Sequence, residues 1–80
     1  MYHAILNLEG KEHIGKGNSA LEAMGNIPLT WDDVKTKGTL TLKKGKLSAE
    51  RFLFMKDTRA VVNSKHRQMH FAKSLETLLK

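Results

Sequence analysis

A pair of strand-like runs joined at a glycine is the feature that most limits how this chain can fold. Both runs lie within residues 35–55, which read K-T-K-G-T-L-T-L-K-K-G-K-L-S-A-E-R-F-L-F-M. Runs rich in Leu, Thr and Phe predict a β-hairpin here, because Gly45 can adopt the positive φ that a tight turn needs. No acidic residue precedes Glu50 in this stretch, so its first five lysines should make the hairpin strongly positive: Lys35, Lys37, Lys43, Lys44 and Lys46.

A second hairpin is expected at the amino-terminal end. Residues 2–8 alternate in polarity, which places three apolar side chains on one face of a strand. These are Ala4, Leu6 and Leu8. Glu9-Gly10-Lys11 is a turn signal, and residues 12–16 should return as a second strand that carries Ile14 inward.

A short helix should follow, starting at Ser19-Ala20-Leu21-Glu22. This is the S-x-x-E capping box, in which the hydroxyl and the carboxylate each accept a hydrogen bond from a free amide. Gly25 weakens the last turn and Pro28 cannot continue a helix, so the helix should have about two to three turns. Its apolar face would consist of Leu21, Met24 and Ile27.

A single helical turn is expected over residues 30–33, which read T-W-D-D. A hydroxyl followed by carboxylates is typical of a helix start, because both accept hydrogen bonds from the free amides there. The side chains of Trp31 and Val34 should then pack against the sheet and cover the passage into the second hairpin.

One long helix is expected at the carboxyl-terminal end, because the chain from Asp57 to Lys80 contains neither Gly nor Pro. Asp57-Thr58 offers an N-cap, and apolar residues recur at helical spacing. They are Val62, Met69, Ala72, Leu75 and Leu79, with Val61, Phe71 and Leu78 beside them. A hinge at Asn63-Ser64 stays open as an alternative, since both side chains can bond the backbone. The opposite face gathers Arg59, Lys65, Arg67 and His70.

These elements predict a single α+β domain over residues 1–80 in the order ββαββα. Two β-hairpins would form a four-stranded antiparallel sheet. The short helix and the long C-terminal helix would pack on one face of it, since each element has one apolar side to bury. A chain of this length buries only roughly 60–65% of the surface of its unfolded form, so a homodimer would add stability. If the helices leave the opposite face of the sheet uncovered, the residues expected on that face are Ile5, Ile14, Phe52 and Phe54.

The composition favours a soluble cytoplasmic protein that does not contact a membrane. The sequence contains no cysteine, which excludes a disulfide framework and a thiolate metal site. No apolar run approaches the roughly 20 residues that span a bilayer. Residues 2–8 lack the basic lead and the cleavage site of a signal peptide.

The net charge of +6 is divided unevenly along the chain. Residues 1–34 hold two lysines against five acidic residues, a net charge of −3. Residues 35–80 hold twelve Lys and Arg against three acidic residues, a net charge of +9. This polarity favours a polyanionic partner, either nucleic acid or an acidic host protein. The alternative, that the lysines only keep a small protein soluble, has equal weight.

No pattern in the sequence predicts catalysis or a bound cofactor. A Cys nucleophile and the G-x-S-x-G motif are both missing, and so small a domain seldom builds a sequestered pocket, so the chain is not expected to be an enzyme. His66 and His70 have the spacing at which two imidazoles reach one metal ion. Lys65 and Arg67 flank them with charge that repels a cation, so no metal site is expected. Residues 15–19, G-K-G-N-S, lack the Walker pattern and are interpreted as a turn before the capped helix.

The cations of the second half can contact phosphates without reading base sequence, provided that they converge on one region of the surface. The predicted nucleic-acid-binding residues are Lys35, Lys37, Lys43, Lys44, Lys46, Lys65, Arg67 and Lys73. Phe52 and Phe54 lie on the same side of their strand and would stack bases if exposed. Large aromatic residues in so small a protein are more often part of the core. The RNA-recognition motif is disfavoured, because the run from Lys37 to Leu42 offers no aromatic residue.

A longer part of the chain resembles a group of known proteins. It runs from Ile27-Pro28-Leu29 through residues 34–41, V-K-T-K-G-T-L-T, to Gly45-Lys46 and a basic carboxyl-terminal helix. This run is similar to small uncharacterised proteins encoded by bacteriophages and prophages. The resemblance spans residues 27–80 and carries no functional motif. It implies a cytoplasmic phage protein that changes a host process by binding.

Two functions therefore remain open. The first is a small basic, non-enzymatic binding module that contacts nucleic acid largely through its phosphates. The second is a phage accessory protein that binds a host or defence protein complex and inhibits or modulates it.

Overall fold

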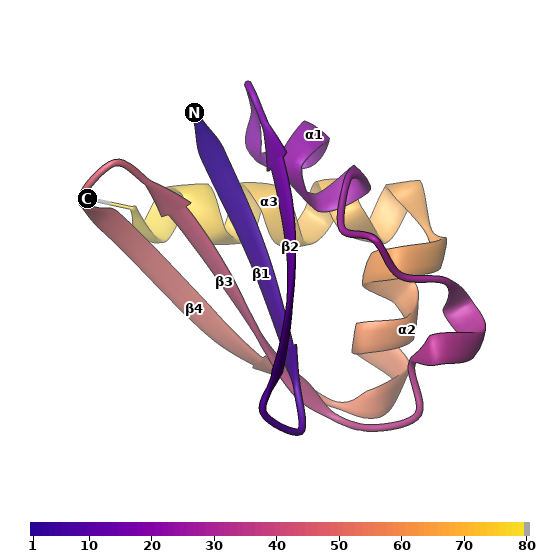
Figure 1. The fold of residues 1–80 in the computed structure, drawn as a ribbon. Helices are drawn as coiled ribbons and strands as arrows, with labels where there is room; N and C mark the ends of the chain where they lie inside the picture. Colours follow the sequence, from indigo (N-terminus) through magenta and orange to yellow (C-terminus); the bar gives the residue numbers. More distant parts are fainter. Residues whose placement is uncertain (80) are drawn as a thin grey trace.

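The computed structural model, which describes residues 1–79, shows one four-stranded antiparallel sheet with helices against one of its faces (Figure 1). The strands are β1 (Tyr2–Leu8), β2 (Lys11–Gly17), β3 (Gly38–Lys44) and β4 (Leu47–Leu53). The helices are α1 (Ala20–Gly25), α2 (Met55–Asn63) and α3 (Lys65–Leu78), with a single 3-10 turn, η1 (Trp31–Asp33). The strand order β2-β1-β3-β4 leaves β2 and β4 at the edges. The predicted α+β fold in the order ββαββα is confirmed.

Tight turns close both hairpins at the residues that the sequence indicated. Glu9 and Gly10 form the loop between β1 and β2, with positive φ values of 52° and 86°. Gly45 opens the loop between β3 and β4, with a φ of 61°. Short loops with positive φ match the right-handed twist of the flanking strands, so each hairpin can form from its own residues.

The inner face of the sheet, which packs against the helices, carries much of the core. Alternate residues of the two central strands are buried there: Ala4, Leu6, Leu8, Leu40 and Leu42. Ile14 pairs with Ile5 on the opposite, outer face and is 42% exposed. The expectation that Ile14 faces inward is therefore wrong. Side chains alternate along a strand, and β2 directs Gly15 and Gly17 inward, so Ile14 must face outward.

These two inward-facing glycines let α1 lie directly against β2. A methyl group on Gly15 would overlap the carbonyl oxygen of Ala23, and one on Gly17 would lie 2.7 Å from the Ala23 nitrogen. Protein interiors are closely packed, so no larger residue fits at either place unless the helix moves. The interpretation of residues 15–19 as a turn is wrong for its first three residues, which belong to β2. It holds for Asn18-Ser19, where the chain bends into α1.

The capping interactions of α1 follow the predicted motif with one difference. Ser19 Oγ accepts a hydrogen bond from the Glu22 backbone N–H at 3.1 Å, as the capping box predicts. The Glu22 carboxylate accepts one from the Asn18 backbone N–H at 3.3 Å, one residue before the amide that the motif implies. The helix has six residues, fewer than expected. Met24 and Ile27 are buried, as predicted.

The carboxyl-terminal helical segment is broken at Ser64 into two helices that run in different directions (Figure 1). The Ser64 N–H closes the last turn of α2, and its hydroxyl accepts a hydrogen bond from the Arg67 N–H at 3.3 Å, which caps α3. The hinge expected at Asn63-Ser64 is confirmed, and it divides the predicted helix into α2 and the long C-terminal helix α3. The predicted apolar stripe is only partly buried: Leu75 is inaccessible, whereas Met69 is 47% exposed.

The first of these helices begins earlier than expected. Its first residue is Met55, after Phe54 as N-cap, so Asp57 lies within the first turn and the N-cap predicted at Asp57-Thr58 is wrong. Thr58 is instead buried, with its hydroxyl 2.9 Å from the Thr36 carbonyl oxygen and 2.8 Å from that of Met55. This hydroxyl therefore links α2 to the segment that leads into β3.

The segment between α1 and β3 matches the prediction where the structure describes it. Residues 31–33 form the single turn η1, and Val34 is fully buried. The side chain of Trp31, which was expected to pack beside it, and residue Lys80 lie outside the described part of the chain. Within residues 1–79, no helix is both long enough and apolar enough to span a membrane.

Gly15→Ala should lower the free energy of unfolding by about 3 kcal/mol, because the added methyl group pushes α1 away from β2. Gly25→Ala is the matched control. It adds the same group at the end of α1, where the nearest neighbour is Gln68 Oε1 at 3.8 Å, and should be neutral or stabilising by up to about 1 kcal/mol. Chemical denaturation measures both changes. Equal stability of Gly15→Ala and the wild type would contradict direct packing of α1 on β2.

Candidate nucleic-acid interface

The eight predicted phosphate-contacting residues do not form one surface. One group lies at the β3–β4 turn, a second precedes β3, and a third lies on α3. The first group is Lys43, Lys44 and Lys46, the second is Lys35 and Lys37, and the third is Lys65, Arg67 and Lys73. The length of β3, about 23 Å, separates the first group from the second. The eight residues therefore do not converge on the one basic region that was expected from the sequence.

The strand register adds a lysine and a histidine to the group at the β3–β4 turn. His3 of β1 pairs with Lys16 of β2 on one side and with Lys43 of β3 on the other. These three residues lie in one row on the outer face of the sheet, about 10 Å long. Together with the two other lysines of the turn they form the tip cluster: Lys16, His3, Lys43, Lys44 and Lys46. Lys44 points to the inner side of the sheet, where its ammonium lies 5.1 Å from the centre of the Tyr2 ring.

Lys16 belongs to the tip cluster although sequence reasoning does not single it out. It lies in the acidic half of the chain, and only the pairing of β2 with β1, and of β1 with β3, brings it near Lys43. Strand alternation, which places Lys16 on the same face as Ile14, is the one local signal that points to it. Local sequence patterns do not give the long-range pairing of the strands, which is what places Lys16 near Lys43.

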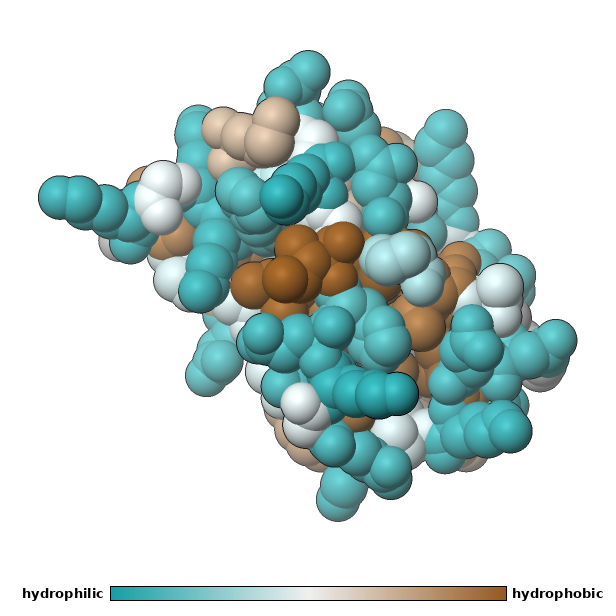
Figure 2. Space-filling view, viewed as in Figure 1, coloured by the Kyte–Doolittle hydropathy of each residue, from teal (hydrophilic) through white to brown (hydrophobic). Residues whose placement is uncertain are grey.

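Acidic residues occupy the same face beyond the tip cluster. Glu50 lies in the next row of paired residues, and Glu12 lies in the row after that. Figure 2, which shows the molecule with the strands in front of α3, has an apolar area surrounded by hydrophilic side chains. Ile5 and Ile14 form an apolar pair on the outer face. The outer face is thus cationic at the tip and mixed in charge beyond it.

An exposed aromatic pair lies at the other end of the outer face. Phe52 and Phe54 are 54% and 65% exposed, and their rings meet edge to face with centroids 5.5 Å apart. The Lys37 ammonium lies 5.9 Å from the centre of the Phe52 ring. The interpretation of both phenylalanines as core residues is wrong. Phe52 pairs with Thr39 on the outer face, and Phe54 leaves the strand as the N-cap residue of α2.

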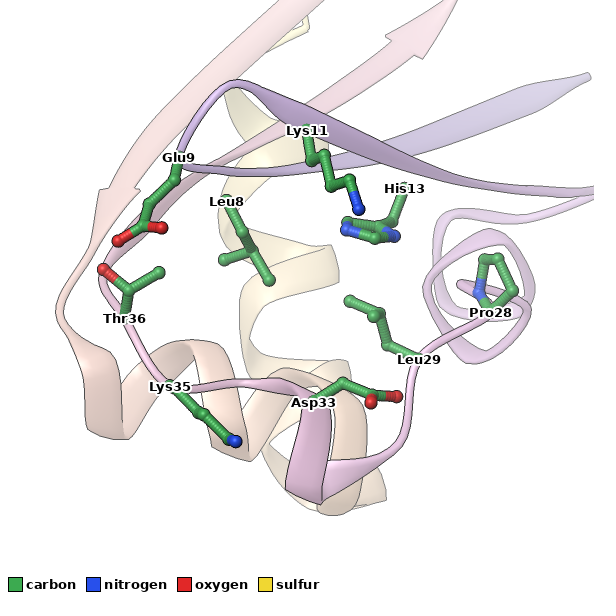
Figure 3. Close-up of a pocket in the computed structure, with 9 residues that line it drawn as sticks. All are labelled: Leu8, Glu9, Lys11, His13, Pro28, Leu29, Asp33, Lys35 and Thr36. Atoms are coloured by element: carbon green, nitrogen blue, oxygen red, sulfur yellow. The ribbon is translucent and has the colours of Figure 1, made fainter.

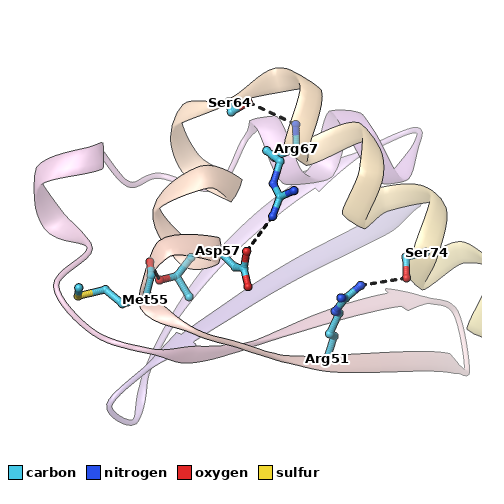
Figure 4. A network of polar contacts seen from close by, with 7 residues as sticks. Arg51, Met55, Asp57, Ser64, Arg67 and Ser74 are labelled. Carbon is cyan, nitrogen blue, oxygen red and sulfur yellow. Dashed lines mark hydrogen bonds and ion pairs between the residues drawn. The ribbon is translucent and has the colours of Figure 1, made fainter.

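The arginine of the α3 group is engaged within the fold (Figure 4). Arg67 Nη2 donates a hydrogen bond to Asp57 Oδ1 at 2.8 Å, and its guanidinium carbon lies 5.4 Å from the centre of the Phe71 ring. Arg51 lies over the same ring at 5.0 Å and donates to the Ser74 hydroxyl at 3.3 Å. Two guanidinium groups therefore cover one buried ring. Because Asp57 offsets the charge of Arg67, this part of α3 is less suited to phosphate than the tip cluster.

An open hollow of about 540 Å³ lies beside η1 and holds Lys35 (Figure 3). It is lined by Leu8, Glu9, Lys11, His13, Pro28, Leu29, Asp33, Lys35 and Thr36. Carboxylates and ammonium groups both border this hollow, so its charge does not favour an anion as clearly as the tip cluster does.

Hydrogen bonds at the edge of this hollow lower the pKa of the Asp33 carboxyl. Its Oδ2 accepts from the Thr30 backbone N–H at 3.0 Å and from the Thr30 hydroxyl at 2.8 Å, and both bonds favour the ionised form. The positive charges of His13 and Lys35 lower the pKa of Asp33 further, while slight desolvation opposes them. The carboxylate thereby caps η1, as the T-W-D-D sequence predicts.

The two histidines at metal-ligand spacing have no third ligand near them. Among the residues that the structure describes, no three His, Cys, Asp or Glu side chains come close enough to hold one metal ion. His70 packs its ring against that of Phe71, with centroids 5.5 Å apart and the planes at 72°. His70 is thus part of the packing around Phe71.

Acid should remove the stability that Asp33 supplies. Its pKa in the folded protein lies below the unfolded value of about 3.9, so its contribution is complete above that value and is lost as the pH falls through the folded pKa. Asp33→Asn should lower the melting temperature at neutral pH and make it less sensitive to acid. Thr30→Val, which keeps the backbone donor, should show a smaller part of both changes. Thermal unfolding across an acid titration tests this, and an unchanged acid sensitivity in Asp33→Asn would contradict it.

No family model, curated protein or solved structure matches this chain. Lys16, His3 and Lys43 of the tip cluster share the outer face of the sheet with the aromatic pair, and the helices leave that face uncovered (Figure 1). That face is the candidate interface.

Proposed function

We propose that this chain is a small basic, non-enzymatic module that binds nucleic acid largely through its phosphates, with the tip cluster as the main contact. The observation that supports the proposal is the row of Lys16, His3 and Lys43, continued by the lysines of the β3–β4 turn. Within this row the described side chains include no carboxylate. Lysines from β2 and β3 therefore act on one side of the sheet, with His3 of β1 between them.

Exposed lysines at a turn suit phosphate binding better than base recognition. Each ammonium group that neutralises a phosphate releases condensed counterions, and this gain does not depend on base sequence. Lys43, Lys44 and Lys46 are all exposed. An ammonium group on a flexible side chain can follow phosphates in different positions, unlike a bidentate guanidinium. The expected ligand is thus a nucleic-acid backbone, bound with little sequence preference.

The remainder of the outer face indicates the path that a bound nucleic-acid backbone would take over the sheet. Thr39 and Thr41 lie in line with Lys43 along β3, and hydroxyl groups commonly donate hydrogen bonds to phosphate oxygens. Glu50 pairs with Thr41 from the β4 side and repels phosphate. The phosphates of a bound strand should therefore follow the β1 side of β3, away from Glu50.

Binding should weaken steeply with salt, and the lysines of the turn should account for much of this dependence. Wild-type affinity for a fluorescently labelled oligonucleotide should fall by orders of magnitude between about 50 and 200 mM salt. Replacing Lys43, Lys44 and Lys46 together by Gln should reduce the slope of log affinity against log salt by about 2 to 3. Fluorescence anisotropy measures both slopes. The matched control, Lys65→Gln with Lys73→Gln on α3, should change the slope less.

Two results would remove this proposal. One is that the wild type binds neither a single strand nor a duplex at about 50 mM salt. The other is that the α3 double variant and the turn variant lose the same affinity for each charge removed. In the first case, an acidic protein that binds through Lys43, Lys44 and Lys46 after nuclease treatment would identify a protein partner instead.

Glu50→Gln should raise the affinity for nucleic acid by about twofold to fivefold, because it removes a carboxylate from the outer face. Glu76→Gln removes the same charge from α3 and should leave the affinity nearly unchanged. Parallel titrations at one low salt concentration compare the two variants with the wild type. Equal gains in both variants would show that only net charge matters and that the outer face is not the contact surface.

A further inference from the structure

The aromatic pair on the outer face points to the class of nucleic acid. We infer that Phe52 and Phe54, with Lys37 beside them, form a stacking site for unpaired nucleobases, so that the protein prefers single strands to duplexes. This inference rests on the proposed function and adds to it the conformation of the ligand. It also assigns a role to two exposed rings that phosphate binding does not use.

The rings are exposed at positions that the backbone sets. Phe52 lies on the outer face through its pairing with Thr39, and Phe54 follows as the N-cap residue of α2. Each is more than half exposed, yet they contact each other edge to face at 5.5 Å. An aromatic side chain has few rotatable bonds, so a base that stacks on either ring meets a surface that loses little freedom on binding.

A cation and a polar path connect the rings to the tip cluster. The Lys37 ammonium, 5.9 Å from the Phe52 ring centre, can reach a phosphate next to a stacked base. Thr39, the partner of Phe52, and Thr41 lead along β3 to Lys43, about 13 Å from Thr39. A short extended strand can therefore place bases on the rings and phosphates at the tip cluster at the same time.

A duplex cannot use this site in the same way. Its bases are already paired and stacked inside the helix, whereas a single strand can turn its bases outward onto aromatic side chains. Stacking on aromatic rings tolerates all four bases, as phosphate binding by the lysines of the tip cluster does. The two sites together therefore describe a binder of single strands with little sequence preference.

The residues around the rings fit a nucleic acid better than a second copy of this chain. A stable homodimer interface is more apolar than the rest of the surface. Beside the apolar pair Ile5 and Ile14, the rows next to the rings carry hydroxyl, amide and carboxylate groups: Thr39, Asn7, Glu12, Thr41 and Glu50. Docking this face on a copy of itself would bury those groups, while a single strand covers only the rings and the path along β3.

The sharpest test varies the ligand and leaves the protein unchanged. Wild-type affinity is measured for three probes of equal length: a single-stranded oligonucleotide, an abasic strand with the same phosphates, and the matching duplex. Stacking on the two rings should make the normal strand at least about fivefold tighter than the abasic strand for each base that stacks. The duplex affinity should be no higher than its phosphate charge alone would give, because its bases do not stack on the rings.

Variants then assign the preference to the rings. Phe52→Ala with Phe54→Ala should lose at least about fivefold in single-strand affinity for each ring removed, and should leave the affinity for the abasic strand unchanged. Phe52→Tyr with Phe54→Tyr keeps the rings and should keep the preference. Leu78→Ala, which removes a 59% exposed apolar side chain from α3, is the matched control and should have no effect.

The outcomes separate this inference from the proposed function. If the wild type binds none of the three probes, the proposed function itself is wrong. If it binds normal and abasic strands equally, or if the alanine variant keeps the single-strand preference, phosphate binding stands and the stacking site is wrong. The abasic comparison needs no variant, so a loss of folding in the alanine variant cannot leave the question open.

Discussion

The antiparallel pairing of β1 with β3 is the interaction on which the rest of this structure depends. Each hairpin can form from its own turn, but these two strands are separated in the sequence by β2, α1 and η1. Pairing of Leu6 with Leu40 aligns the apolar residues of both hairpins on the inner face, which the helices cover. The same register sets His3 beside Lys43 on the outer face. This pairing therefore contributes to both the core and the tip cluster.

The outer face of the sheet is subject to a constraint that all two-layer folds of this kind share. A sheet with helices on one side must leave its other face to water or to a partner. Here Lys16 and Lys43 lie at one end, Ile5 and Ile14 pair in the middle, and Phe52 and Phe54 are exposed at the other end. Single apolar side chains are ordinary on protein surfaces, whereas two large rings in mutual contact form a patch that binding would explain.

In the basic half of the chain, residues 35–80, arginines and lysines have different surroundings. Arg51 and Arg67 lie over the buried ring of Phe71, and Arg59 donates a hydrogen bond to the Val34 carbonyl at 2.9 Å. A planar guanidinium can stack and donate in several directions, so all three arginines of the chain serve the packing of the helices. The described lysines remain exposed. Net charge alone therefore overstates the number of cations that are free to meet a polyanion.

Local chemistry in the sequence determined the elements of this protein, and tertiary pairing determined its surface. The positive φ of Gly45, the cap at Ser19 and the break at Ser64 act through residues a few positions away, so the pattern of hairpins and helices was predictable. The exposure of Phe52 and the place of Lys16 beside Lys43 were not, because they follow from which strands pair and in what register. A shift of one residue in that register exchanges the two faces of a strand, and local propensity does not encode it.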